Sequence, residues 1–318
     1  MRVIGSASGF AAALDAQRAC GREVGLVPTM GALHAGHRSL IGRAAAECDV
    51  VAVTLFVNPL QFGDKADLAA YPRDLQGDVR EAEAAGASIV FAPVVEEMYP
   101  GYPQPPATVV DVRGVSEGLE GASRPGHFCG VATVVAKLFA LAGRCRAYFG
   151  EKDFQQLAVV RALTEDLCLP VQVVACPTVR EVDGVALSSR NTRLSPAERR
   201  AAVALYRCLQ AGRGALDGGE RDLDVVRGLM RSVMEAEPLV DCDYAEVVDT
   251  RTLRRPEVTA GELRLLVAAN VGPVRLIDNV GVVVGPVAPA RRVAAAGKAA
   301  GKAAGKATGT AADTGKER

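Results

Sequence analysis

Two of the three histidines in the chain stand close together in a segment that contains glycine. His34 and His37 are separated by Ala35 and Gly36, and they follow an apolar run typical of a buried strand. A strand, a glycine-bearing turn and a helix start present unpaired N–H groups and the positive end of the helix dipole, which together favour a phosphate. Two imidazoles at this spacing can each donate an N–H to phosphate oxygens. We therefore predict an anion site over residues 29–37.

Two other interpretations of this histidine pair stay open on the residues alone. In one, the imidazoles only cap or solvate the start of a helix. In the other, they bind zinc, although a three-residue spacing without a nearby carboxylate or cysteine ligand is unusual for that metal. The eight cysteines form no CxxC pair and are never closer than eight positions apart. The anion site is the stronger prediction because HxGH directly follows a buried strand.

A second polar segment, residues 148–156, follows a later apolar run. It contains Lys152, one of three lysines before residue 290, although arginines are numerous there. A compact ammonium at the carboxyl end of a strand can neutralise a phosphoryl group. We expect Asp153 to cap the next helix and to face a ribose hydroxyl, and we expect Gln156 one turn further on, at the helix mouth. The alternative is an ordinary surface helix start.

Two further segments carry polar groups suited to binding. Ser188, Ser189 and Arg190 combine two hydroxyls with a guanidinium, which favours a phosphate clamp on a segment that closes over a nucleotide. Such turns are more commonly solvated loops. Asn58 and Gln61 follow another apolar run and are neutral polar groups suited to a hydroxylated, anionic small substrate.

The elements that must position these groups follow an α/β pattern up to residue 178. Short β-branched runs alternate with helical stretches, as a parallel sheet with crossover helices requires. The predicted strands are residues 23–27, 50–57, 88–92, 147–149 and 171–175, and the predicted helices are residues 39–48, 75–85, 130–142 and 153–167. We expect a Rossmann-like, doubly wound parallel sheet with its site at the carboxyl ends of the strands.

The pattern changes after Pro177. Two long predicted helices, 196–216 and 222–236, precede predicted strands near 243–248, 264–268 and 274–276. We predict a Rossmann-like nucleotide- and substrate-binding domain over 1–178, a smaller α+β lid domain over 179–285 with a hinge near 177–183, and a basic tail over 286–318. The tail repeats Ala-Ala-Gly-Lys and has too few large apolar residues to fold alone, so we expect disorder there.

The composition of the 318 residues argues against several classes of protein. Basic and acidic residues number 37 each, so no bulk attraction to nucleic acid or membrane is expected. With no tryptophan and 4% aromatic residues, platforms for stacked bases are scarce. No apolar run approaches the roughly 20 residues of a membrane span, and no charged-then-apolar leader opens the chain. With scattered cysteines, this predicts a cytoplasmic location.

Six motifs together resemble one known family. PTMGALHxGH, FVNPxQFG, YPR, RPxHFxGV, FGEKDxQQ and SSRN occur in order between Gly25 and Asn279. On these motifs the chain resembles the pantothenate synthetase family of the HxGH nucleotidyltransferase superfamily, related to class I aminoacyl-tRNA synthetases. The resemblance implies an AMP-forming ligase: pantoate and ATP give an enzyme-bound pantoyl adenylate and pyrophosphate, and β-alanine then displaces AMP to form pantothenate.

The resemblance also implies a role for individual residues. The catalytic residues would be His34, His37, Lys152 and Arg190, with His37 as the acid that the family usually assigns. ATP would bind Met30, Gly31, His34, His37, Gly150, Lys152, Asp153, Val179, Leu187, Ser188, Ser189 and Arg190. Pantoate and β-alanine would bind Gln61, Gln156 and Asn58. Mg²⁺ would be held mainly by ATP oxygens, so no protein residue is named as a metal ligand.

Two positions depart from the family pattern. Leu187 stands where many relatives have methionine, a change that conserves volume and should be tolerated. Gly77 precedes Asp78 where relatives often have an acid, so a metal role for that pair stays open. The resemblance further implies a homodimer whose partners are small molecules, with no membrane or nucleic-acid partner.

Two rival functions stay open at this point. One is a nucleotidyltransferase that joins a nucleotide to a phosphorylated acceptor, but such an acceptor should meet arginine or lysine rather than two glutamines. The other is a non-catalytic nucleotide sensor or, through the basic tail, a weak nucleic-acid binder.

Overall fold

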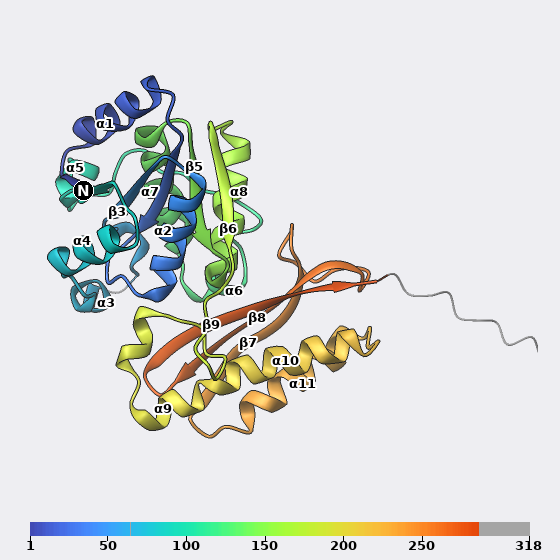
Figure 1. The fold of residues 1–318 in the computed structure, drawn as a ribbon. Coiled ribbons are helices and arrows are strands. Elements are labelled where there is room, and N and C mark those ends of the chain that lie inside the picture. Colours follow the sequence, from blue (N-terminus) through green and yellow to red (C-terminus); the bar gives the residue numbers. More distant parts are fainter. Residues whose placement is uncertain (64, 286–318) are drawn as a thin grey trace, which may run out of the picture. The chain divides into compact units, whose positions relative to one another are not determined.

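The computed structural model describes residues 1–63 and 65–285 (Figure 1). The predicted tail over 286–318 lies outside the described residues. In the described part, no helix is both long and apolar enough to cross a membrane.

A parallel sheet of six strands forms the N-terminal part of the described chain. Its order is β1-β4-β3-β2-β5-β6, with bounds β1 (Arg2–Ile4), β2 (Val24–Thr29), β3 (Val50–Leu55), β4 (Ile89–Phe91), β5 (Cys145–Gly150) and β6 (Val171–Cys176). The five predicted strands are confirmed, and β1 is a short edge strand, paired with β4, that the apolar pattern missed. Chain order reverses between β2 and β5, the kind of switch point where doubly wound sheets bind ligands.

Helices cover both faces of this sheet because successive side chains of a buried strand point to opposite faces. On one face lie α1 (Ala7–Ala19), α7 (His127–Ala142) and α8 (Phe154–Asp166), around a core that includes Phe10, Leu26, Phe91, Phe139 and Phe149. On the other face lie α2 (Ala35–Glu47) and α4 (Leu75–Ala84), around Val27, Ile41, Val53, Val90 and Tyr148.

Two helices begin earlier than predicted, which matters for the site. The helix expected from Ser39 begins at Ala35, so His37 lies in its first turn, and the helix expected from Gly130 begins at His127. Short elements connect the longer ones: η1 (Pro59–Gln61), α3 (Lys65–Ala70), α5 (Val95–Met98), α6 (Leu119–Ser123), η2 (Glu151–Asp153) and η3 (Ser189–Arg193).

A three-stranded antiparallel sheet follows in the described chain. Its strands are β7 (Val240–Asp249), β8 (Gly261–Val271) and β9 (Val274–Val284), and a second core joins the sheet to α9 (Pro196–Ala201), α10 (Val203–Asp217) and α11 (Leu223–Glu235). This confirms the predicted α/β fold with a smaller α+β part. The domain boundary at 178/179 stays a prediction.

Two predicted elements of this second part were wrong in extent. The helix predicted over 196–216 is interrupted at Ala202, whose amide still donates to the Glu198 carbonyl at 2.9 Å, so the interruption is local. The strand predicted at 274–276 continues to Val284. The apolar pattern stopped at Asp278 and Asn279, but both side chains are buried and hydrogen-bonded, so the strand continues through them.

Candidate active site

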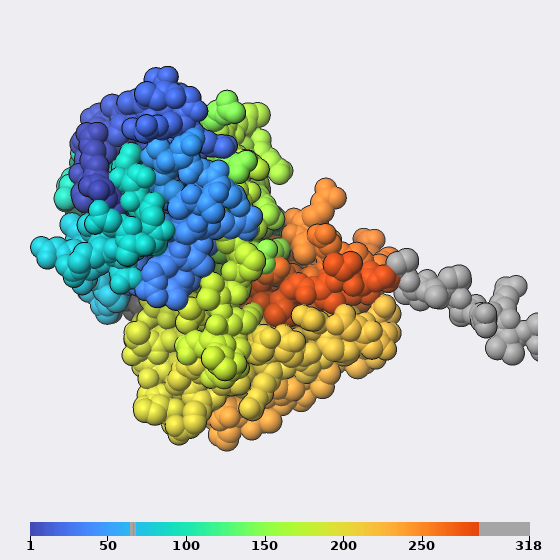
Figure 2. Space-filling model, in the orientation of Figure 1, coloured from blue at the N-terminus to red at the C-terminus, as the bar shows by residue number. Residues whose placement is uncertain are grey.

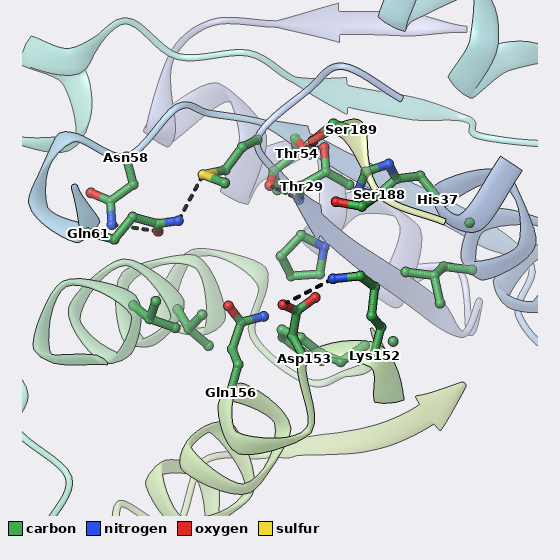
Figure 3. A pocket seen from close by; sticks show the side chains of 18 of the residues that line it. Thr29, His37, Thr54, Asn58, Gln61, Lys152, Asp153, Gln156, Ser188 and Ser189 are labelled. Atoms are coloured by element: carbon green, nitrogen blue, oxygen red, sulfur yellow. Dashed lines mark hydrogen bonds and ion pairs between the residues drawn. The ribbon is translucent and has the colours of Figure 1, made fainter. Parts of the chain in front are cut away.

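A cavity of about 240 Å³ opens where β2, β3 and β5 end (Figure 3). It brings together residues that are far apart in the sequence, and all predicted site residues except Gly31 line it: Met30, His34, His37, Asn58, Gln61, Gly150, Lys152, Asp153, Gln156, Val179, Leu187, Ser188, Ser189 and Arg190. These residues therefore gather at the carboxyl ends of the strands, where the site was predicted. The ligand role of each residue stays a prediction.

The two histidines form a capping box at the start of α2, in which the side chain of each accepts a hydrogen bond from a backbone amide. His34 is the N-cap residue, and its Nδ1 accepts from the Gly36 amide at 3.1 Å, while Nδ1 of His37 accepts from the His34 amide at 3.4 Å. Because each Nδ1 accepts, the proton of each neutral imidazole lies on Nε2. The capping interpretation is thus correct for Nδ1, and it leaves an Nε2–H donor on each ring.

Both imidazoles are neutral at neutral pH. Burial, reinforced by the neighbouring His34 ring, lowers the pKa of His37 to about 3. Burial and the charge of Lys152 also lower the pKa of His34. The ring centroids lie 4.1 Å apart, a separation at which two protonated rings would repel each other strongly. The site therefore offers N–H donors here rather than cations.

The loop between β2 and α2 is held by a buried carboxylate from α4. Asp78 accepts from the amides of Ala32 at 3.0 Å and Leu33 at 2.8 Å. Gly31 adopts a left-handed φ of 82°, and a Cβ there would lie 2.7 Å from Asp78 Oδ2. Gly31 therefore shapes the loop without lining the cavity, and Asp78 fixes that loop through two backbone amides.

Lys152 lies in η2, the turn that follows β5. Its side chain is 18% exposed, and its Nζ lies 3.9 Å from Oδ1 of Asp153. Asp153 stands at the N-cap position of α8, as predicted, but its side chain makes no capping hydrogen bond and lies instead beside the cavity (Figure 3). Burial alone would raise the pKa of Asp153, but the charges of Lys152 and Arg190 outweigh burial and keep it below its usual value.

Asn58 and Gln61 form a connected pair at the end of β3. The Asn58 side chain donates to the Gly130 carbonyl and to Gln61 Oε1, at 3.0 and 3.1 Å, and accepts from the Tyr99 hydroxyl at 3.0 Å. Asn58 is thus committed to internal contacts. In contrast, Nε2 of Gln61 donates to the sulfur of Met30, a weak acceptor that a substrate oxygen can replace.

Two residues to which no role was assigned from the sequence also line the cavity. His127 lies 2.9 Å, through Nδ1, from the Gln61 carbonyl and 3.1 Å, through Nε2, from Nη1 of Arg124. A guanidinium only donates, so Nε2 accepts and Nδ1–H donates to Gln61. Burial and the charge of Arg124 lower the pKa of His127 to about 4. The motif RPxHFxGV contains both residues and was the available signal.

The segment after β6 completes the cavity. Arg180 and Ala186 form an isolated antiparallel bridge, and the Leu187 amide donates to the Val179 carbonyl at 3.0 Å. Ser188 then caps η3 by accepting from the Arg190 amide at 3.2 Å. Figure 2 shows yellow-green residues of this part of the chain at the surface, next to blue residues of the N-terminal part. The segment predicted as a clamp therefore forms a wall of the cavity, and its closure over a nucleotide stays a prediction.

Comparison with known proteins gives a consistent result. The sequence profile of the pantoate-beta-alanine ligase family matches residues 2–281. The chain is 52% identical over 280 residues to pantothenate synthetase of Heliobacterium modesticaldum, covering 88% of this chain and 98% of that protein. It is 51% identical, over the same shares of both chains, to pantothenate synthetase of Roseiflexus castenholzii.

Two solved structures are similar over nearly the whole described chain. Pantothenate synthetase from Thermus thermophilus has a TM-score of 0.82 and 46% identity, covering 90% of this chain and 100% of that one. Pantoate-beta-alanine ligase from Francisella tularensis, complexed with beta-gamma ATP and beta-alanine, has a TM-score of 0.72 and 31% identity, covering 88% of this chain and 97% of that one.

Proposed function

Because the chain belongs to the pantoate–β-alanine ligase family, we propose that its cavity carries out the family reaction through an acyl adenylate. The chain is a ligase that condenses pantoate with β-alanine, using ATP, to give pantothenate. In the proposed first step, a carboxylate oxygen of pantoate attacks the α-phosphorus of ATP and pyrophosphate leaves. In the second, the β-alanine amine attacks the acyl carbon and AMP leaves.

One observation supports this proposal more than any other. The two neutral imidazoles, the ammonium of Lys152 and the amides of Gln61 and Gln156 line the same cavity. Phosphoryl transfer needs positioned donors and positive charge around the phosphate oxygens, and no covalent nucleophile from the protein. The adenylate route matches a site with donors for phosphate on one side and neutral amides on the other.

We assign the phosphate contacts to His34, His37, Lys152 and Arg190. The histidines act through Nε2–H, because Nδ1 of each ring is already an acceptor in the helix cap. Burial lowers the pKa of His37 to about 3, so we assign it as a neutral N–H donor at neutral pH, and the acid role implied by the family resemblance stays a prediction. The other proposed nucleotide contacts are Met30, Gly31, Gly150, Asp153, Val179, Leu187, Ser188 and Ser189. Among these, Gly31 acts through the shape of the loop.

We assign pantoate and β-alanine to the part of the cavity around Gln61 and Gln156. Arg124 also lines the cavity there, and its charge suits the carboxylate that each of these substrates carries. Asn58 is reassigned from a ligand to a support for Gln61, because its amide contacts are internal. The family match removes the rival interpretation as a nucleotidyltransferase for a phosphorylated acceptor.

Mg²⁺ is also part of the proposal. In the described residues, no group of three or more His, Cys, Asp or Glu could hold a metal ion. Mg²⁺ prefers oxygen ligands and is commonly held by substrate phosphates and water with one or two carboxylates. The half-exposed carboxylate of Asp153, beside the cavity, fits that donor set. When bound with ATP, the ion would neutralise phosphate charge.

Two expectations from the sequence stay in the proposal. A cytoplasmic location agrees with eight free cysteines in the described residues, because reducing compartments keep thiols unpaired. A homodimer is expected from the family resemblance, and sedimentation equilibrium of the purified chain tests it directly.

The adenylate route is tested by separating the two half-reactions. With ATP and pantoate but no β-alanine, the enzyme should release one equivalent of pyrophosphate and no free AMP, and added β-alanine should then release AMP. A heavy oxygen label in the pantoate carboxylate should appear in that AMP. Pyrophosphate that appears only with β-alanine, or AMP without the label, would contradict the acyl adenylate. The amide of pantoic acid, which lacks the attacking oxygen anion, is the matched control substrate.

A further inference from the structure

The turn that carries Lys152 is held from the second sheet by one buried side chain. Nδ2 of Asn279, in β9, donates to the Glu151 carbonyl at 3.0 Å and to the Lys152 carbonyl at 2.7 Å. Asn279 is 2% exposed, and it is not among the described residues that line the 240 Å³ cavity. The hydrogen bonds of its Nδ2 therefore reach the backbone of the lysine turn.

The orientation of this amide is itself fixed. Oδ1 of Asn279 accepts from Nε of Arg264, on the neighbouring strand β8, at 2.7 Å. The Arg264 guanidinium lies 4.2 Å from the ring centroid of Phe154 and donates through Nη2 to Oε2 of Glu151 at 3.0 Å. A guanidinium only donates, so it keeps Oδ1 on its own side and directs Nδ2 toward the turn.

The lysine turn has little other local support. Neither η2 nor the start of α8 has a side-chain capping hydrogen bond of its own. The Glu151 and Lys152 carbonyls are partly buried, and the Asn279 amide donates a hydrogen bond to each of them. The position of the Lys152 backbone thus depends on a residue that is 127 positions later in the chain.

The same stretch of β9 also contacts the opposite wall of the cavity. The Asn279 carbonyl accepts from Nη2 of Arg180 at 3.0 Å, and Asp278 forms a two-pronged ion pair with that guanidinium at 2.6 and 2.9 Å. Arg180 belongs to the bridge that precedes Ser188 and Arg190. Two neighbouring residues of β9 therefore hold both the lysine turn and the base of the segment that completes the cavity.

We propose that Asn279 is a positioning residue for the adenylation step, which sets the Lys152 ammonium at the phosphates, and that Arg264 orients Asn279. This inference rests on the proposed role of Lys152. The reason is geometric: electrostatic stabilisation of a transition state requires the ammonium to be held in place before the reaction, and displacements near 1 Å can cost up to about a hundredfold in rate.

The test is a double-mutant cycle on single-turnover pyrophosphate release, with enzyme in excess over ATP. Asn279→Ala should lower the rate constant about tenfold or more, with the pantoate KM within about twofold of the original. In a Lys152→Ala background, the same change should cost about twofold or less, because the group that it positions is gone. Asn270→Ala, at a half-buried asparagine near the far end of β8, is the control and should change neither parameter.

A second variant keeps the test decisive if Asn279→Ala does not fold. Arg264→Lys retains a cation near Glu151 but loses the planar donor that orients Asn279, so the same pattern of non-additivity with Lys152→Ala is expected. Thermal unfolding of each variant shows whether it is folded at the assay temperature. Equal losses in both backgrounds would overturn the inference while leaving the role of Lys152 intact. A Lys152→Ala variant with the original rate would instead refute the proposed role of the lysine.

Discussion

The contact between α7 and the loop that carries Gln61 leaves no room for a side chain at Gly130. A Cβ there would lie 2.5 Å from the Leu60 carbonyl carbon and 2.7 Å from the Gln61 amide nitrogen. Real Cβ atoms essentially never approach closer than 3.0 Å, so Gly130→Ala must displace the Leu60–Gln61 backbone by about half an ångström. The Gly130 carbonyl also accepts from Asn58, so a shift on either side disturbs the bond that supports Gln61.

The magnitude follows from this geometry. Overpacking of this kind costs about 1–3 kcal/mol of stability. A displacement approaching 1 Å at a binding group can cost up to about a hundredfold, so half that displacement predicts a loss of about tenfold in kcat/KM for pantoate. The KM for ATP should change much less, because the histidine cap and Lys152 do not contact Gly130.

The assay is steady-state formation of pantothenate at varied pantoate, with urea unfolding in parallel. Gly228→Ala is the matched control, because Gly228 is an exposed glycine inside α11 with open space where its Cβ would go. This control should gain roughly 0.5–1 kcal/mol of stability and keep its KM values. If Gly130→Ala keeps the original pantoate kcat/KM and loses no stability, the packing argument for the position of Gln61 is refuted.

Three further predictions concern single side chains of the cavity. Lys152→Ala should lower the rate of pyrophosphate release by about a hundred- to a thousandfold, with an unchanged midpoint of urea unfolding. A variant in which only the KM for ATP rises would contradict the role of Lys152 in the transition state. Gln156→Ala should raise the KM for pantoate about tenfold and change kcat by less than about threefold, as measured from initial rates at varied pantoate. A fall in kcat without a change in this KM would contradict the assigned substrate contact. The pKa of His37 is lowered to about 3 in the folded protein, whereas an ordinary histidine has a pKa of 6.5. The unfolded chain therefore binds a proton at His37 at a higher pH than the folded chain does. As pH drops from 6.5 toward 3, the free energy of unfolding falls by up to about 1.4 kcal/mol per pH unit. For the His37→Asn variant, the free energy of unfolding measured with urea should fall less steeply between pH 6.5 and pH 3. Equal slopes for the variant and the original protein would mean that the imidazole is not held neutral in the folded state.

Much of the fold and site was predictable because the signals are local. A buried parallel strand is a short apolar run whatever its neighbours are, and polar residues placed directly after such a run must lie at one edge of the sheet. His34, Gln61 and Lys152 follow three different strands in this way, and they do line one cavity. Their convergence required no knowledge of the loops between them.

The contacts that the sequence did not reveal join distant segments. Asp78 holds a loop more than forty residues earlier, and although the sequence singled this residue out for a possible metal role, it did not reveal that partner. Asn279 interrupts an apolar pattern, which suggests the end of a strand, although it lies buried within one. Whether a polar residue is buried within a strand depends on the hydrogen-bond partner that it finds, and the local sequence pattern does not identify that partner.

The asparagine contact has a consequence for the order in which the molecule becomes functional during synthesis. All six strands of the parallel sheet have been synthesised by residue 176, whereas β9, which holds the lysine turn, is synthesised about a hundred residues later. Because folding can begin at the N-terminal part while translation continues, a nascent chain acquires its sheet well before the lysine is fixed. The growing polypeptide therefore has its parallel sheet and the histidine cap of α2 before β9 can support the lysine turn.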